Sequence, residues 1–151
     1  PFDPSISNHD RRKLQSNENT FQPLRIAFIT SALDDQRNGT NAAAIDFIKD
    51  NILPRTADFW SKALAVVPVS DKLIISTSEL DQRAYCGDSE FTKVPTDHIS
   101  NGLADTDLVL YVSGSPSSRF CSGTTLAVAV ACNFDQFDRP IAGAVNFCLD
   151  Q

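Results

Sequence analysis

The apolar run from Leu108 to Val112, within the segment DLVLYVSG, constrains the fold of this chain more than any other feature. A strand with one exposed face alternates apolar and polar residues, whereas a strand covered on both faces has a continuous apolar run. The segment from Leu24 to Thr30, LRIAFIT, is rich in branched and aromatic residues and predicts a second strand. The chain is therefore expected to form a sheet that has other structure packed on both faces of its buried strand.

Helical spacing dominates the segment between these two strands. Two sets of apolar residues recur at intervals of three or four: Ile45, Ile48 and Ile52, then Trp60, Leu64 and Val67. Pro54 lies between the sets and predicts a kink or two abutting helices, with Pro54 in a first turn, and Pro68 ends the pattern. A strand, a long helix and a buried strand begin a βαβ unit. Because a hairpin-like last strand would make the sheet mixed, the predicted fold class is α/β or α+β, with a twisted mixed sheet and a long backing helix.

The other segments predict less regular structure. Residues 66–76, VVPVSDKLIIS, favour a short hairpin, and residues 76–106 favour a long loop. Residues 125–132, TLAVAVAC, are compatible with a helix or a strand. Residues 1–23 are polar and lack periodicity, which is typical of an extended or disordered arm. The folded domain is therefore expected to span residues 24–151.

Composition argues against nucleic acid as a partner and against a transmembrane segment. Thirteen basic and nineteen acidic residues give a formal charge of −6, and no long basic run is present, so nucleic acid is not expected as a partner. No window approaches the roughly 18 to 20 apolar residues that span a bilayer, so no transmembrane segment is expected.

Four cysteines and a sequon indicate an oxidising compartment. The even number of cysteines suits two disulfides, and a zinc site would favour close CxxC pairs, which are absent from this sequence. Asn38, Gly39 and Thr40 form an N-glycosylation sequon. Together these features predict a glycoprotein that is secreted, on the cell surface or in a vesicle lumen, with carbohydrate on Asn38.

Side chains suited to catalysis are few. The histidines are His9 and His98, and no HExxH motif occurs, so this chain cannot build a zincin metal centre by itself. Asp97, His98 and a loop serine could be imagined as a triad, but adjacent Asp and His side chains do not orient in that way. A nucleophilic pair of Cys86 and His98 is also possible, although disulfides are the preferred interpretation of the cysteines. No catalytic residue and no metal ligand is therefore assigned within this chain.

Five segments of the second half of the chain form an ordered series: YCGD (85–88), VPTDHI (94–99), DTDLVLYVSGSP (105–116), RFCSGTTLAVAVAC (119–132) and DRPIAGAVNFC (138–148). Together with two upstream segments, LRIAFITSALDD and NILPRTADFWSKALAV, this series resembles the leishmanolysin family, which is peptidase family M8 and includes invadolysin-like members. The resemblance extends from about residue 24 to residue 151.

The resemblance implies a zinc metalloendopeptidase with a metzincin-like amino-terminal lobe, in which a twisted sheet and a backing helix precede the HExxH helix. Zinc is thus implied for the complete enzyme and not for this chain alone, which we expect to be inactive. The chain would be the substrate-cleft part of such an enzyme and would bind an extended peptide or protein substrate. Another segment, or a companion chain, would carry the HExxH helix. The alternative is a non-catalytic, leishmanolysin-derived subunit that binds a partner through its edge strand.

The resemblance also implies a role for the last strand. In metzincin-like lobes the strand before the active-site helix is an antiparallel edge strand whose unpaired N–H and C=O groups bind the substrate. Six residues are expected to do so here: Ile141, Ala142, Gly143, Ala144, Val145 and Asn146. Because small side chains allow a peptide to approach closely, Gly143→Val should impair binding more than folding. The alternative is an ordinary packed strand in which Gly143 marks a bulge.

A disulfide pairing is implied in the same way. Four cysteines allow three pairings, and composition does not choose among them. The resemblance favours Cys86 with Cys132, which would tie the long loop to the sheet, and Cys121 with Cys148, which would brace the last strand.

Overall fold

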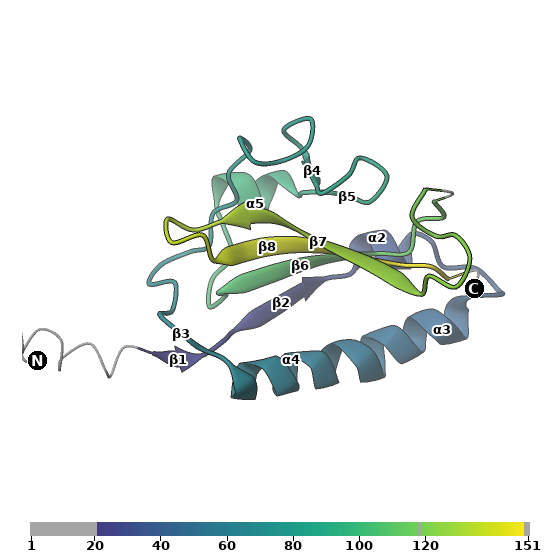
Figure 1. Cartoon of the computed structure of the whole chain (residues 1–151), viewed down its shortest axis with the longest axis horizontal. Coiled ribbons are helices and arrows are strands. Elements are labelled where there is room, and N and C mark those ends of the chain that lie inside the picture. Colours follow the sequence, from purple (N-terminus) through teal and green to yellow (C-terminus); the bar gives the residue numbers. More distant parts are fainter. Residues whose placement is uncertain (1–20, 118, 150–151) are drawn as a thin grey trace, which may run out of the picture.

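A four-stranded sheet forms the centre of the computed structural model, which describes residues 21–117 and 119–149 (Figure 1). In spatial order the strands are β2 (Ile26–Ile29), β6 (Leu108–Ser113), β8 (Pro140–Phe147) and β7 (Ala127–Phe134). The strands β2, β6 and β8 run parallel to one another, and β7 runs antiparallel to β8. The predicted α+β class with a mixed sheet is thus confirmed.

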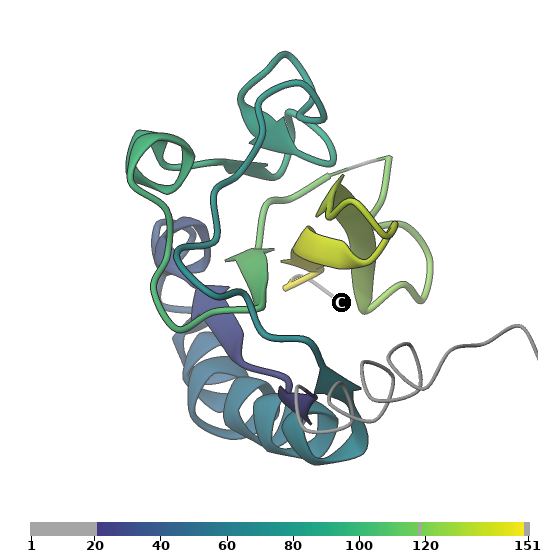
Figure 2. The same cartoon turned by 90° about the vertical axis from the view of Figure 1, so that its left-hand side faces the viewer.

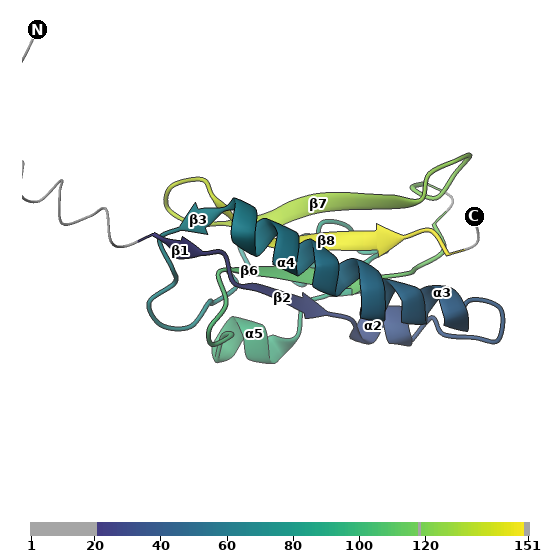
Figure 3. The same ribbon diagram turned by 90° about the horizontal axis from the view of Figure 1, so that it is seen from below.

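A long helical layer covers one face of the sheet (Figures 1 and 3). After the short helix α2 (Ser31–Asp34), this layer consists of α3 (Ala42–Phe47), the π-helical segment η1 (Ile48–Ile52) and α4 (Leu53–Ala63). Pro54 lies in the first turn of α4, as predicted, where its missing N–H is tolerated. Ile45 and Ile48 are buried in one cluster with Val112 of β6, so this part of the predicted apolar stripe holds the helix on the sheet. The other predicted members are exposed: Ile52, Trp60, Leu64 and Val67.

The helix ends earlier than the sequence pattern indicates. Its last residue is Ala63, and Leu64 already has extended dihedral angles. The next residues form β3 (Ala65–Val66), which pairs antiparallel with β1 (Gln22–Pro23). The hairpin predicted over residues 66–76 is therefore wrong, because its first strand pairs with β1 instead.

Short elements and loops cover the opposite face of the sheet, as Figures 1 and 2 show. The elements are β4 (Tyr85–Cys86), β5 (Thr92–Lys93) and α5 (Thr96–Ser100), all within the segment predicted as a long loop. Val109 and Tyr111 of β6 are fully buried on this face, whereas Val112 is buried beneath the helical layer. Strand β6 is therefore covered on both faces, as its apolar run predicts.

Three further features concern the ends of the domain and the segment TLAVAVAC. This segment forms most of β7 and is thus a strand. Residues 1–20 of the predicted arm lie outside the described residues, and its last two residues form β1. Within the part of the chain that the structure describes, no helix is long and apolar enough to cross a membrane.

The last strand lies inside the sheet, so its predicted position at the edge is wrong. On one side Ala142 of β8 lies opposite Val109 of β6, and on the other side Ala144 lies opposite Val130 of β7. Residues 141–146, predicted to bind substrate, therefore have no open side on which a peptide strand could pair. The β7–β8 ladder is irregular directly after the pair of Ala131 and Gly143, where Cys132 of β7 is an extra residue, and again between Asn133 and Phe134. The predicted bulge therefore lies beside Gly143, but its extra residue belongs to β7.

A tight turn explains this arrangement. Asp135 N donates a hydrogen bond to Arg139 O (2.9 Å), and Asp138 N donates to Asp135 O (3.1 Å). Asp138 has a positive φ of 59°, which aspartate tolerates better than most residues. The turn folds β7 back along β8, so β7 occupies the edge position that the sequence analysis assigned to the last strand.

Candidate functional site

The unpaired edge of the sheet belongs to β7, which Figure 3 shows on the outer side of β8. The direction of its main-chain groups follows from the hydrogen bond that Cys148 N donates to Leu126 O (2.9 Å). In an antiparallel ladder such bonded pairs alternate with unbonded ones, so Val128 and Val130 also direct their main-chain groups toward β8. Three residues consequently direct their N–H and C=O groups away from the sheet: Ala127, Ala129 and Ala131.

This stretch of β7, residues 127–131, is hereafter the open edge. The side chains of its three alanines are exposed, and no described residue hydrogen-bonds to their outward main-chain groups. An unpaired strand allows another extended chain to approach and pair with it through main-chain hydrogen bonds. The sequence signal for this site is the alternation of Ala and Val in TLAVAVAC, which fits an exposed strand of period two.

The remainder of β7 is closed by side chains. Asn133 is buried, its Oδ1 accepts a hydrogen bond from Ser76 N, and its Nδ2 donates one to Ser76 O, both at 2.9 Å. Glu79 Oε2 accepts a hydrogen bond from Phe134 N (2.9 Å). Glu79 thus occupies the main-chain N–H of Phe134, and the side chain of Asn133 holds Ser76 against β7. These four residues are hereafter the closed end. Sequence reasoning missed them, because their contacts join segments that are distant in the chain.

Two disulfides hold the surroundings of the open edge, in the pairing that the resemblance implies. Cys86 is bonded to Cys132 of β7, with a Cα–Cα distance of 5.2 Å. Cys121 is bonded to Cys148, with a Cα–Cα distance of 5.4 Å. Next to the first bridge, Gly87 lies so close to β7 that a Cβ atom there would overlap the side chain of Val130. Disulfides such as these form in oxidising compartments.

Asn146 has a structural role in place of the predicted substrate contact. Its side chain is fully buried, and its Oδ1 accepts hydrogen bonds from Ser113 Oγ and Ser115 N, both at 2.8 Å. Its Nδ2 donates a hydrogen bond to Ser115 O (3.1 Å). The amide therefore fixes the beginning of the β6–β7 connection to the end of β8.

His98 of α5 is half-buried, and its ring lies against Tyr111 and not in a catalytic arrangement. Its Nδ1 lies 3.0 Å from the hydroxyl oxygen of Tyr111, which is fully buried. Burial lowers the pKa of His98 and raises that of Tyr111, so a neutral imidazole that accepts a hydrogen bond from the tyrosine hydroxyl fits both shifts. Among the described residues no loop serine forms a hydrogen bond with His98, and the disulfide removes the thiol of Cys86.

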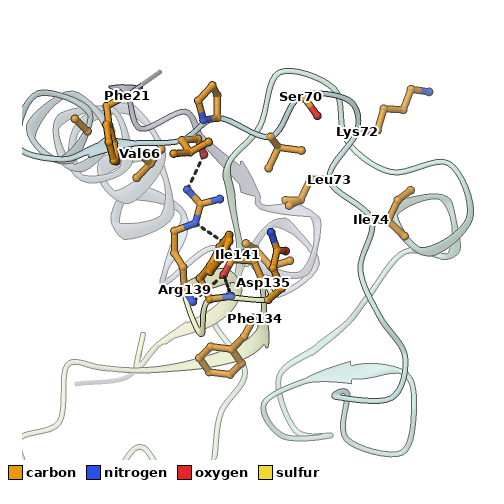
Figure 4. Close-up of a pocket in the computed structure, with 16 residues that line it drawn as sticks. Phe21, Val66, Ser70, Lys72, Leu73, Ile74, Phe134, Asp135, Arg139 and Ile141 are labelled. Carbon is orange, nitrogen blue, oxygen red and sulfur yellow. Dashed lines mark hydrogen bonds and ion pairs between the residues drawn. The ribbon is translucent and has the colours of Figure 1, made fainter. Parts of the chain in front are cut away.

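A pocket of about 780 Å³ lies beside the turn that joins β7 to β8 (Figure 4). In it, Arg139 Nη1 donates a hydrogen bond to Val67 O (3.0 Å), and Arg139 Nε lies 3.0 Å from Asp135 Oδ2. The first contact ties the turn to the segment after β3, and the second lies within the turn itself. None of residues 127–131 lines this pocket, so it is separate from the open edge.

Asn38, the residue predicted to be glycosylated, lies in the exposed connection between α2 and α3. Its Oδ1 accepts hydrogen bonds from Thr40 N (2.9 Å) and Thr40 Oγ1 (2.6 Å). The sequon is thus at the surface, and glycosylation of Asn38 stays a prediction.

The described residues do not fit a zinc site. No three His, Cys, Asp or Glu side chains among them are placed to hold a metal ion. The four cysteines are in disulfides, and His98 forms a hydrogen bond with Tyr111. What this part of the chain offers chemically is the unpaired main chain of the open edge.

Comparison with known proteins shows which family the chain resembles. The sequence profile of the leishmanolysin family matches residues 40–151. The chain belongs to the leishmanolysin family. A leishmanolysin-like peptidase of Caenorhabditis elegans is 26% identical over an alignment of 192 positions, gaps included, which covers 98% of this chain and 28% of that protein. A leishmanolysin homolog of Crithidia fasciculata is 29% identical, over 79% of this chain and 16% of that protein.

The leishmanolysin of Leishmania donovani is 31% identical over 101 residues, which cover 67% of this chain and 15% of that protein. The chain therefore spans less than a third of the length of these relatives. The matched family is a metallopeptidase family, which implies zinc for its complete enzymes.

Proposed function

We propose that this chain is the amino-terminal, substrate-cleft part of a leishmanolysin-like zinc metalloendopeptidase. The zinc ligands and the general base would lie outside the residues described here, in another segment of the polypeptide or in a companion chain. The family membership supports the reaction class, and the much greater length of the relatives supports the division of labour.

The open edge is the observation that carries this proposal. An extended peptide that lies antiparallel to β7 would bond to the outward N–H and C=O groups of Ala127, Ala129 and Ala131. Such pairing requires no particular side chain of the peptide, as expected for a protease that cleaves within proteins. It would also hold the peptide backbone extended, so that the bond to be cleaved keeps a fixed orientation during hydrolysis.

The two disulfides and the exposed sequon support a secreted, cell-surface or vesicular location. Treatment with a peptide N-glycosidase tests the sequon, because wild-type protein should lose mass and Asn38→Gln protein should not. The same treatment leaves the peptide-binding proposal untouched.

Ala129→Pro tests the open edge directly. Proline removes an N–H that points away from β8, so it deletes a donor for the peptide and spares the β7–β8 ladder. Ala129→Val is the matched control, because it adds bulk at the same position and keeps the N–H. The natural full-length protein, loaded with zinc, would be assayed with reduced and alkylated lysozyme as an unfolded substrate.

We expect Ala129→Pro to lower kcat/KM about tenfold, which corresponds to one lost hydrogen bond. Ala129→Val should stay within about twofold of the wild type. Equal activities of the two variants, at equal stability, would contradict binding along β7. Retained binding of the unfolded substrate without any hydrolysis would instead support the non-catalytic interaction subunit.

A further inference from the structure

The open edge ends abruptly, and this boundary carries a consequence for the peptide. A peptide strand can pair with residues 127–131, but beyond Ala131 the N–H of Phe134 is already bonded to Glu79, and Asn133 holds Ser76 against β7. The peptide must therefore leave the strand at this point. The peptide side chain beyond Ala131 therefore contacts the closed end of β7.

Glu79 lies directly on the path that the peptide would follow. Because Asp135 N bonds to Arg139 O (2.9 Å), the neighbouring Phe134 directs its main-chain groups away from β8. Glu79 Oε2 accepts the outward N–H of Phe134 and so lies on the outer side of β7. Its side chain is exposed, and it forms no salt bridge with a described residue.

The geometry points to a charge-selective subsite: we propose that Glu79 binds a lysine, an arginine or a free amino terminus of the bound peptide. The subsite rests on the proposed function, because it needs a peptide paired with the open edge. Ala131 and Phe134 are three positions apart, or about 10 Å along a strand. The long side chain of a lysine or arginine in the peptide can bridge most of that distance.

The antiparallel arrangement fixes which end of the peptide is selected. Strand β7 runs from Ala127 to Phe134, so an antiparallel peptide has its amino-terminal side near Phe134. The positive charge is therefore favoured on the amino-terminal side of the paired stretch. The formal charge of −6 of the whole chain acts in the same direction but without positional selectivity.

A scan of charged peptides tests this subsite. In a set of uncharged nonapeptides, a single Lys, Gln or Glu is moved through each position, and hydrolysis by the zinc-loaded full-length protein is measured. Glu79→Gln keeps an oxygen that can accept the N–H of Phe134 and removes the charge. Asp58→Asn removes one charge from α4, where Asp58 pairs with Lys62 in the exposed layer, and so controls for net charge.

We expect the wild type to prefer Lys over Glu at one position on the amino-terminal side, by about two- to fivefold, as for an exposed ion pair. Glu79→Gln should abolish this preference, Asp58→Asn should retain it, and raised salt should weaken it. An unchanged preference in Glu79→Gln would overturn the subsite. If Ala129→Pro cleaves all peptides as the wild type does, the proposed function itself fails, which is a different result.

Discussion

Gly143 lies in the centre of the sheet, and its substitution tests the interior position of β8. A Cβ atom on Gly143 would lie 2.9 Å from Val130 O and 3.2 Å from Leu110 Cδ2. The leucine side chain can move, but the carbonyl belongs to the main chain of β7 and must shift with the strand. Gly143→Ala should therefore destabilise the fold, which reverses the expectation from sequence that this residue matters more for binding.

The magnitude follows from the cost of overpacking, which is about 1 to 3 kcal/mol. Replacing glycine by alanine also stabilises a protein by up to about 1 kcal/mol, through the unfolded state. Gly39→Ala is a matched control for this effect, because no atom lies within 4 Å of a Cβ at Gly39 and its φ is not positive. The difference between the two variants should be about 1 to 3 kcal/mol, or roughly 3 to 10 °C in Tm for a domain of this size.

Thermal unfolding followed by circular dichroism, with the disulfides intact, measures this difference. If Gly143→Ala unfolds within about 1 °C of Gly39→Ala, the close contact with Val130 does not limit packing and the reasoning is refuted. A fully stable Gly143→Ala variant that has lost binding of an unfolded substrate would return the peptide site to β8.

Asp107 is fully buried and accepts hydrogen bonds from Arg25 Nε (2.9 Å) and Nη2 (2.8 Å), so Asp107→Asn should cost about 3 kcal/mol in urea unfolding at neutral pH. The exposed Asp58→Asn should cost less than about 1 kcal/mol, and equal losses would contradict the role of burial. Burial opposes ionisation of Asp107, but hydrogen bonds from Arg25 and from main-chain N–H groups outweigh it and lower its pKa. The stability from this carboxylate is thus present above about pH 4 and is lost as pH falls through the folded-state pKa. The free energies of unfolding of the wild type and of Asp107→Asn should therefore become equal in acid. Replacing Cys86 and Cys132 together by serine removes a bridge that closes a loop of 46 residues, which should lower the free energy of unfolding by about 4 kcal/mol. A loss below about 1 kcal/mol would show that the bridge does not constrain the unfolded chain.

Local patterns in the sequence predict the elements of this fold well where burial is strong. The apolar run Leu108–Val112 predicts a strand covered on both faces, and the spacing of Ile45 and Ile48 predicts the helix that covers one of them. Both follow from the side chains of the element itself, since a periodicity of apolar residues reports which faces are buried. The hairpin predicted over residues 66–76 fails for the complementary reason. Its strand β3 is two residues long, and its partner β1 lies about forty residues away in the chain.

The position of a strand within a sheet depends on information that its own residues do not contain. Small residues such as those around Gly143 suit an edge that a peptide approaches, and they suit equally an interior strand on which two neighbours pack closely. The turn from Asp135 to Arg139 decides between these, because it folds β7 onto β8 and leaves β7 outside. The Ala–Val alternation of TLAVAVAC is the local signal that agrees with this outcome: a strand with little apolar bulk on one face gains little from burial. The proposed peptide binding thus remains compatible with the structure although the predicted strand, β8, lies inside the sheet. A peptide needs an unpaired antiparallel edge, and the neighbouring strand β7 supplies one.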